Sequence, residues 1–177
     1  MRRTDSGVIL GLYRSDHRRQ TLEDALVVGI RSLDTSYNYR GFDSHRILSS
    51  TASDLLSAFS ISTKVGFFQE SGRVAHSLAP GRLRRAVEES ASDLGRAPDV
   101  VFLHNPEKSL VGMSPTHARE RLDAACAALD EAVAVGLCAS WGISSWDTRP
   151  LIEALNGDSF AKTPTPDVLM VRAGLTP

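Results

Sequence analysis

Four side chains able to bind or move a proton follow short apolar runs along the chain: Asp34, Tyr39, Lys64 and His104. An isolated charge buried on a strand is very costly, so we expect Asp34 and Lys64 to pair. A tyrosine near the lysine cation would have its phenolate favoured and its pKa lowered from about 10, which suits proton transfer near neutral pH. His104 could bind the same substrate oxygen as Tyr39. Together these residues predict a site that polarises a carbonyl or hydroxyl oxygen.

Such a site needs a scaffold that brings the ends of separate strands together. The sequence offers one, because apolar runs alternate with helical patterns along the chain. The runs predict strands at Gly7–Leu12, Ser32–Ser36, Ile61–Phe67, Asp99–His104, Cys138–Ser144 and Asp167–Arg172. The patterns between them predict helices that begin near Thr21 and Asp147, and helices at Ser44–Phe59, Pro80–Leu94 and Ala118–Val135. Repeated βα units of this spacing imply a parallel sheet.

The segment after the first strand indicates whether this sheet is open or forms a barrel. Residues 13–19 contain no glycine, so they lack the phosphate loop of an open doubly wound sheet. We therefore expect an α/β fold with a single domain over residues 1–177. We expect this domain to be an incomplete TIM-type (β/α) barrel of about six parallel strands and five helices. Active residues of such barrels lie at the C-terminal ends of the strands, where the four candidate side chains fall.

At these strand ends the chain resembles the aldo-keto reductase family, over nearly its whole length. That family has an Asp-Tyr-Lys-His tetrad, with the first two residues spaced as Asp34 and Tyr39 are. The spacing favours Tyr39 over Tyr37. Lys64 resembles the family lysine on the third strand, and His104 the histidine that ends the fourth. The resemblance implies that Tyr39 is the general acid and base, tuned by Lys64 and Asp34. It also implies that His104 orients a carbonyl oxygen and that NADPH supplies hydride.

The resemblance also assigns cofactor and substrate positions. Ser144 and Ser145 match the place where the family holds the nicotinamide carboxamide, usually with Ser-Asn, and Met170 falls where it usually has a glutamine. Tyr13 replaces a small residue beside the nicotinamide. From the residues alone, Ser144 and Ser145 could instead only cap the following helix, and Trp141 and Trp146 could line a substrate pocket or only pack. NADP(H) is the cofactor that the family implies. The family's phosphate-binding segment, however, follows strands seven and eight, beyond the six strands predicted here.

Three functions stay open at this point. The first is reduction of a carbonyl of a small metabolite with NADPH, with a tyrosine as general acid. The second is a cofactor-independent lyase or isomerase, a dehydratase or an epimerase, on the same tetrad. The third is a non-catalytic remnant or a subunit that completes another chain. A barrel without its last two βα units exposes two strand edges and part of an apolar core, so we expect a homodimer or another assembly that covers them.

The composition and the net charge limit which binding partners and which cellular location we expect for this chain. The 177 residues include 20 Lys and Arg and 21 Asp and Glu, and the resulting net charge of −1 gives no electrostatic reason to bind nucleic acid or an anionic membrane. Neither a membrane helix nor a signal peptide is visible. Cys126 and Cys138 lack metal-ligand spacing, so we expect buried thiols, no metal and a cytoplasmic location. Four histidines have no ligand spacing, and we expect them at the surface, in loops or at helix starts: His17, His45, His76 and His117. The loop expected at Glu70–Ala79, which carries His76, could border the pocket.

Overall fold

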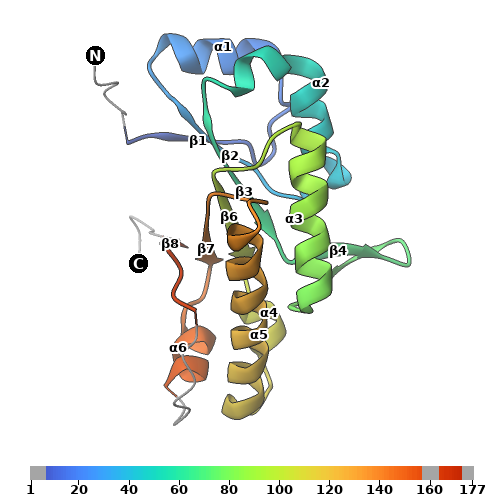
Figure 1. The fold of residues 1–177 in the computed structure, drawn as a ribbon, viewed down its shortest axis with the longest axis vertical. Coiled ribbons are helices and arrows are strands. Elements are labelled where there is room, and N and C mark those ends of the chain that lie inside the picture. Colours follow the sequence, from blue (N-terminus) through green and yellow to red (C-terminus); the bar gives the residue numbers. More distant parts are fainter. Residues whose placement is uncertain (1–6, 157–163, 173–177) are drawn as a thin grey trace.

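The computed structural model describes residues 7–156 and 164–172 and shows a curled sheet flanked by helices (Figure 1). Its strands are β1 (Ile9–Gly11), β2 (Ser32–Asp34), β3 (Ser60–Val65), β6 (Val100–His104), β7 (Ser140–Ser145) and β8 (Val168–Val171). They follow one another in chain order across the sheet, and every neighbouring pair is parallel. This is the strand order of a (β/α) barrel, so the predicted incomplete barrel of six strands is confirmed.

Five helices correspond to the ones that the sequence predicts. They are α1 (Arg19–Val27), α2 (Ser44–Leu56), α3 (Pro80–Leu94), α5 (Pro115–Ala134) and α6 (Arg149–Leu155). The bounds of α3 match the prediction, with Pro80 in the first turn and Gly95 in the left-handed conformation (φ 69°) directly after the end. Helix α1 begins before Thr21, at Arg19, and no side chain caps it.

The structure adds a short helix, α4 (Glu107–Leu110), that was not predicted. A single turn has too few residues to show a helical repeat of apolar positions, so the sequence carries no periodic signal for it. None of the helices among residues 7–156 and 164–172 is long and apolar enough to cross a bilayer.

Side chains alternate between the two faces of the sheet, so the hydrophobic core lies on one face and the candidate site on the other. Successive side chains of a strand point to opposite faces of the sheet. Apolar residues on one face are buried against the helices: Leu33 of β2, Ile61 of β3 and Leu103 of β6. Asp34 and His104 come one position after Leu33 and Leu103, and Lys64 comes three positions after Ile61. Because these offsets are odd, all three side chains face the hollow side of the curled sheet.

Two hydrophobic clusters hold the helices against the sheet, one under α1 and α2 and the other under α3, α5 and α6. Cys126 and Cys138 are free and buried in the second cluster, which confirms the predicted buried thiols. Trp141 of β7 lies in the same cluster with 1% exposure, and its indole Nε1 donates to Asp130 of α5 at 3.3 Å. Trp141 therefore packs against the helices, and this position contradicts its assignment to substrate binding.

A hairpin interrupts the βα order after β3. Strands β4 (Phe67–Glu70) and β5 (Arg73–His76) pair antiparallel around Ser71 and Gly72, whose φ values are 48° and 78°. Two residues with positive φ form the turn that matches the twist of a hairpin. The hairpin projects beside α3 (Figure 1). The loop expected at residues 70–79 is therefore wrong where β5 lies. The sequence does not reveal the hairpin, because its strands are short and carry little apolar alternation.

Strands β1 and β8 are the edges of the sheet within the part of the chain that the structure describes. Apolar side chains of β8, including Leu169 and Val171, are exposed, and an apolar cavity of about 590 Å³ opens between α5, α6 and β8. Open edges and exposed apolar surface favour association. The expected homodimer or other assembly stays a prediction, and the mass of the chain in solution, measured by light scattering, tests it.

Candidate active site

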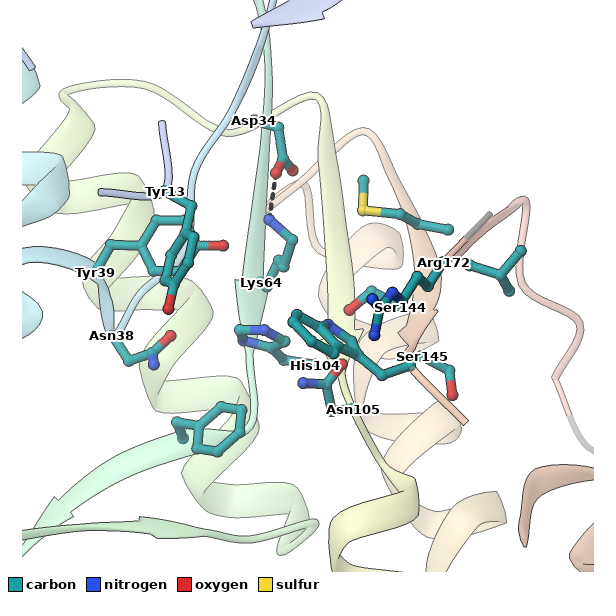
Figure 2. A pocket seen from close by; sticks show the side chains of 14 residues that line it. Tyr13, Asp34, Asn38, Tyr39, Lys64, His104, Asn105, Ser144, Ser145 and Arg172 are labelled. Atoms are coloured by element: carbon teal, nitrogen blue, oxygen red, sulfur yellow. Dashed lines mark hydrogen bonds and ion pairs between the residues drawn. The ribbon is translucent and has the colours of Figure 1, made fainter. Parts of the chain in front are cut away.

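A cavity of about 550 Å³ lies at the C-terminal ends of the parallel strands (Figure 2). It is lined by Tyr13, Asp34, Asn38, Tyr39, Lys64, Phe67, His104, Asn105, Ser144, Ser145, Trp146, Met170, Val171 and Arg172. Every site residue that the sequence predicts lies in this wall except Trp141. The structure thus brings together side chains from β2, β3, β6, β7 and β8 that are distant in the chain.

Lys64 of β3 and Asp34 of β2 form a buried ion pair at one side of the cavity (Figure 2). Lys64 Nζ donates to Asp34 Oδ2 at 2.5 Å and to the carbonyl oxygen of Thr35 at 2.8 Å. Ser62 Oγ donates to the other carboxylate oxygen at 2.8 Å. Asp34 is in register with Ser62, which points to the same face as Lys64. Burial lowers the pKa of Lys64, although the charge of Asp34 opposes this. The predicted pairing is confirmed.

Tyr39 is held beside this pair by a tight turn. It begins the 3₁₀ helix η1 (Tyr39–Phe42), and the three residues after it have φ values of 54°, 68° and 77°. These left-handed conformations turn the chain sharply after Tyr39. Lys64 Nζ lies over the face of the Tyr39 ring, 5.2 Å from its centre. The phenol hydroxyl has no hydrogen-bond partner among the described residues, so it is available to a ligand in the cavity.

The pKa of Tyr39 moves in the direction opposite to the prediction. Burial, followed by the charge of Asp34 and the neighbouring Tyr13, raises it to about 12. The prediction assumed a lysine cation acting freely on the phenolate. In the structure the ammonium of Lys64 is paired with Asp34, which offsets its field at the phenol. Tyr39 is therefore a neutral phenol at pH 7, and a donor of a proton or a hydrogen bond.

Tyr37, the other candidate for the acid, lies outside the cavity. Its hydroxyl donates to Glu89 Oε2 at 2.5 Å, and its ring packs against Phe42 and Phe68. The spacing from Asp34 that favoured Tyr39 over Tyr37 thus selects the tyrosine that lines the cavity.

His104 stands at the end of β6, across from Tyr39 (Figure 2). The centres of the two rings are 6.4 Å apart, and the imidazole also meets the ring of Phe67 edge-on at 4.8 Å. Its Nδ1 lies 3.1 Å from Ser36 Oγ. Burial, followed by repulsion from the Lys64 cation, lowers the pKa of His104 to about 3. The imidazole is therefore neutral at pH 7.

His76 fixes the backbone of His104 from the hairpin. Its Nε2 donates to the His104 carbonyl oxygen at 2.8 Å, and its Nδ1 lies 2.6 Å from Ser109 Oγ in α4. Gly66 allows this close packing, because a Cβ there would lie 3.0 Å from the His104 carbonyl oxygen and 3.1 Å from His76 Nε2. His76 is half-buried and so is not the surface histidine that was expected.

His17 and His45 are fully buried, and their expected surface location is wrong. His17 Nε2 lies 2.6 Å from Ser44 Oγ, which in turn lies 2.6 Å from Thr35 Oγ1. His45 Nε2 lies 2.8 Å from Thr63 Oγ1. Both threonines are chain neighbours of the ion pair, so these histidines help to hold the strands that carry it. Their burial depends on how α2 packs, which no local pattern reveals.

The end of β7 forms the opposite wall. Ser144 Oγ donates to the Leu103 carbonyl oxygen at 3.4 Å, and Ser145 Oγ donates to Glu107 Oε2 at 3.0 Å. The other oxygen of Glu107 accepts from the backbone N–H of Trp146 at 3.0 Å. Glu107, at the start of the unpredicted helix α4, therefore fixes the segment that follows β7.

The mouth of the cavity carries large, exposed side chains. Tyr13 stands on one side and Trp146, which is 68% exposed, on the other. The guanidinium of Arg172, after β8, lies over the Trp146 ring at 5.5 Å from its centre. Met170 of β8 adds an apolar surface to the same wall. These positions suit contact with a flat ring or a small organic ligand.

Asn105 is a candidate site residue that the sequence analysis missed. Its Oδ1 is buried and has no hydrogen-bond partner among the described residues, although the residue lines the cavity. Its backbone is left-handed (φ 51°), and its N–H donates to the Ser144 carbonyl oxygen at 2.7 Å. An unsatisfied buried acceptor costs about 1–3 kcal/mol, which a ligand donor would recover. The signal in the sequence was the position directly after His104 at a strand end.

The site therefore combines a neutral phenol, a neutral imidazole and an ion pair of no net charge. Such groups can bind a ligand oxygen and donate a proton to it. Across residues 7–156 and 164–172, no three His, Cys, Asp or Glu side chains are grouped so that they could hold a metal ion.

Comparison with known proteins agrees with this arrangement. The model of the aldo/keto reductase family matches residues 10–174. The chain therefore belongs to the aldo/keto reductase family. A search of curated proteins found no significant match.

Solved structures share the fold. An aldo-keto reductase from Bacillus halodurans superposes with a TM-score of 0.73 at 20% identity, over 94% of this chain and 53% of that one. A glycerol dehydrogenase from Gluconobacter oxydans gives 0.62 at 21% identity, over 83% and 47%. An aldo/keto reductase from Klebsiella pneumoniae, solved with NADP and acetate, gives 0.54 at 19% identity, over 84% and 49%. The chain thus spans about half the length of these structures.

Proposed function

We propose that the chain carries the active site of an oxidoreductase that reduces a carbonyl group of a small metabolite with NADPH, with Tyr39 as general acid. The observation that carries the proposal is the neutral Tyr39 hydroxyl, which has no hydrogen-bond partner in the described ranges and lies in one cavity with His104 and the buried Asp34–Lys64 pair. A hydroxyl in this setting can polarise a carbonyl oxygen and then protonate it. Membership of the aldo/keto reductase family supports the same chemistry.

The raised pKa of Tyr39 is compatible with this role. Reduction of a carbonyl leaves an alkoxide, which is about as basic as hydroxide, the conjugate base of water with a pKa of about 15.7. Proton transfer from Tyr39, with a pKa of about 12, to this oxygen is therefore downhill.

The wall around Asn105 fits the nicotinamide end of NADP(H). A primary carboxamide offers the N–H donor that the buried Asn105 Oδ1 lacks. Ser144 lies beside Asn105, and Arg172 is the one guanidinium that lines the cavity within the described ranges, where it would pair with a phosphate. When bound, the dihydronicotinamide would supply hydride to the carbonyl carbon. The protein residues orient the ring and the substrate and supply the proton.

The experiment is a titration with NADPH followed by a turnover assay. Trp146 lies in the cavity, whereas Trp141 is buried in the core, so binding should quench the emission of Trp146. We expect saturable quenching in the wild type and its loss in Trp146→Phe. With a panel of small aldehydes and ketones, we expect consumption of NADPH that matches alcohol formation.

Other results would select the other two functions. Turnover of a hydroxy compound or an epimerisable ketone without consumption of NADPH would indicate a cofactor-independent lyase or isomerase that uses the same four residues. Absence of NADPH binding and of any turnover would indicate a remnant, or a subunit that completes another chain.

A further inference from the structure

The hydroxyl of Ser36 lies at the centre of a small buried network behind His104. Its Oγ lies 2.6 Å from Asn38 Oδ1, 3.2 Å from the Lys64 carbonyl oxygen and 3.1 Å from His104 Nδ1. A hydroxyl has one hydrogen to donate. Asn38 Oδ1 and the Lys64 carbonyl can only accept, so this hydrogen is directed to them. Ser36 Oγ must then accept the hydrogen of His104 Nδ1.

The length of the Ser36–Asn38 contact supports this direction. O–H···O bonds are commonly about 2.5–3.0 Å long, and the Ser36–Asn38 contact falls in this range. N–H···O bonds are usually longer than about 2.7 Å. The 2.6 Å contact is therefore an O–H···O bond donated by Ser36, rather than a bond donated by the Asn38 amide.

The assignment leaves the other nitrogen of His104 bare. The imidazole is neutral at pH 7, so it carries one N–H, which is on Nδ1. Nε2 then holds a lone pair and accepts a hydrogen bond. It has no partner among the described residues, and His104, which is 7% exposed, lines the cavity across from Tyr39 (Figure 2).

We propose that Ser36, held by Asn38, fixes His104 as the Nδ1–H tautomer, so that Nε2 accepts a hydrogen bond from a ligand hydroxyl. Ser36 and Asn38 are positioning residues, and His104 makes the contact. The ligand half of this inference rests on the proposed function, because it places the reacting oxygen between Tyr39 and His104.

An alcohol complements this pair of groups better than a carbonyl compound does. An alcohol oxygen accepts from the Tyr39 hydroxyl while its own hydrogen goes to His104 Nε2. A carbonyl oxygen also accepts from Tyr39, but it has no hydrogen to offer and meets the lone pair of Nε2. The site should therefore bind the alcohol partner of the reaction more tightly than the carbonyl partner. This differs from a histidine that donates to a carbonyl oxygen.

Long-range proton–nitrogen NMR of the labelled chain at pH 7.5 tests the tautomer directly. The His104 ring signals are assigned by their absence in His104→Gln. We expect the nitrogen shift of a protonated Nδ1 and of a bare Nε2. A protonated Nε2 in the wild type would overturn the proposal. The measurement needs no cofactor and no turnover, so its outcome is separate from that of the proposed function.

Variants of Ser36 show what sets the tautomer. Ser36→Ala removes the acceptor of the Nδ1–H, so we expect the His104 signals to shift toward protonated Nε2. Ser36→Thr keeps a hydroxyl and should restore the wild-type pattern. Ser90→Ala is the matched control, because Ser90 is also buried but donates within α3 to Ala86 at 2.7 Å. An unchanged tautomer in a folded Ser36→Ala chain would contradict the role of Ser36.

A matched pair of probes tests the ligand half. Cyclohexanol and cyclohexanone have the same carbon frame and differ at the oxygen. Titration against the His104 signals should show about three- to tenfold tighter binding of the alcohol, the contribution of one neutral hydrogen bond. Ser36→Ala should abolish or reverse this preference. Equal binding of both probes to the wild type, or no binding of either, would reject the ligand half.

Discussion

The ammonium of Lys64 and the carboxylate of Asp34 meet at 2.5 Å on the hollow side of the sheet, and both side chains are largely buried there. Removing one partner of a buried pair leaves the other charge uncompensated, which costs about 3–5 kcal/mol. The pair therefore supports the fold as well as the site.

Asp34→Asn should lower the free energy of unfolding by about 3–5 kcal/mol in chemical denaturation, because Lys64 loses its counter-charge. The double variant Asp34→Leu with Lys64→Met should recover much of this loss, because it removes both charges together. Asp54→Asn is the control, since Asp54 pairs with Arg19 on the surface and its loss should cost far less. A similar loss in Asp34→Asn and Asp54→Asn would contradict a buried pair.

Tyr39→Phe should reduce carbonyl turnover by about 10²–10⁴-fold, the usual contribution of a general acid. Tyr37→Phe should leave turnover unchanged, because that hydroxyl contacts Glu89 outside the cavity. Steady-state assays measure both variants, and circular dichroism checks that each is folded. Equal activity of Tyr39→Phe and the wild type would remove Tyr39 from the mechanism.

The strand order and the convergence of the tetrad could be predicted because they depend on features that the sequence shows directly. Apolar runs mark buried parallel strands, and their ends share one side of a barrel. The positions of Asp34, Lys64 and His104 at the ends of predicted strands were enough to assign them to the candidate site. The spacing of Tyr39 from Asp34 then selected the tyrosine that lines the cavity.

Features that depend on tertiary packing could not be predicted. The pKa of Tyr39 rises because burial and the pairing of Lys64 outweigh the effect of the lysine cation. Trp141 could face either side of β7, and its burial follows from where α5 packs. Asn105 Oδ1 lacks a donor among the residues that the structure describes, and this can be seen only when the positions of the neighbouring donors are known.

The buried histidines predict a loss of stability in mild acid. Burial lowers the pKa of His17 and of His76, that of His45 to about 4 and that of His104 to about 3. The unfolded chain therefore binds more protons below about pH 6.5, so stability is present above that pH and falls below it.

Denaturant titrations at pH 7.5 and pH 5.0 measure this effect, which should approach about 1.4 kcal/mol per pH unit for each of His45 and His104, whose pKa values lie below pH 5 in the folded chain. His45→Gln should reduce the pH dependence of the free energy of unfolding. An unfolding midpoint that does not change between the two pH values would show that these imidazoles are not buried in the neutral form.

Asn105→Ala should weaken binding of NADPH, because the carboxamide N–H loses its acceptor. The expected loss is about threefold to tenfold for one neutral hydrogen bond. The acetylpyridine analogue of NADPH lacks that N–H, so its affinity should be the same for the variant and the wild type. Quenching of Trp146 emission measures both ligands without turnover. An equal loss for both ligands would show that Asn105 acts on the shape of the cavity and not on the carboxamide.

Isotope transfer tests the central claim most directly. NADPH that carries deuterium on the reactive carbon of its nicotinamide is incubated with the chain and a small aldehyde, and the alcohol is analysed by mass spectrometry. We predict deuterium on the former carbonyl carbon with the wild type and at least about a hundredfold slower transfer with Tyr39→Phe. Absence of deuterium with the wild type across the carbonyl panel, or equal transfer by both proteins, would contradict the account.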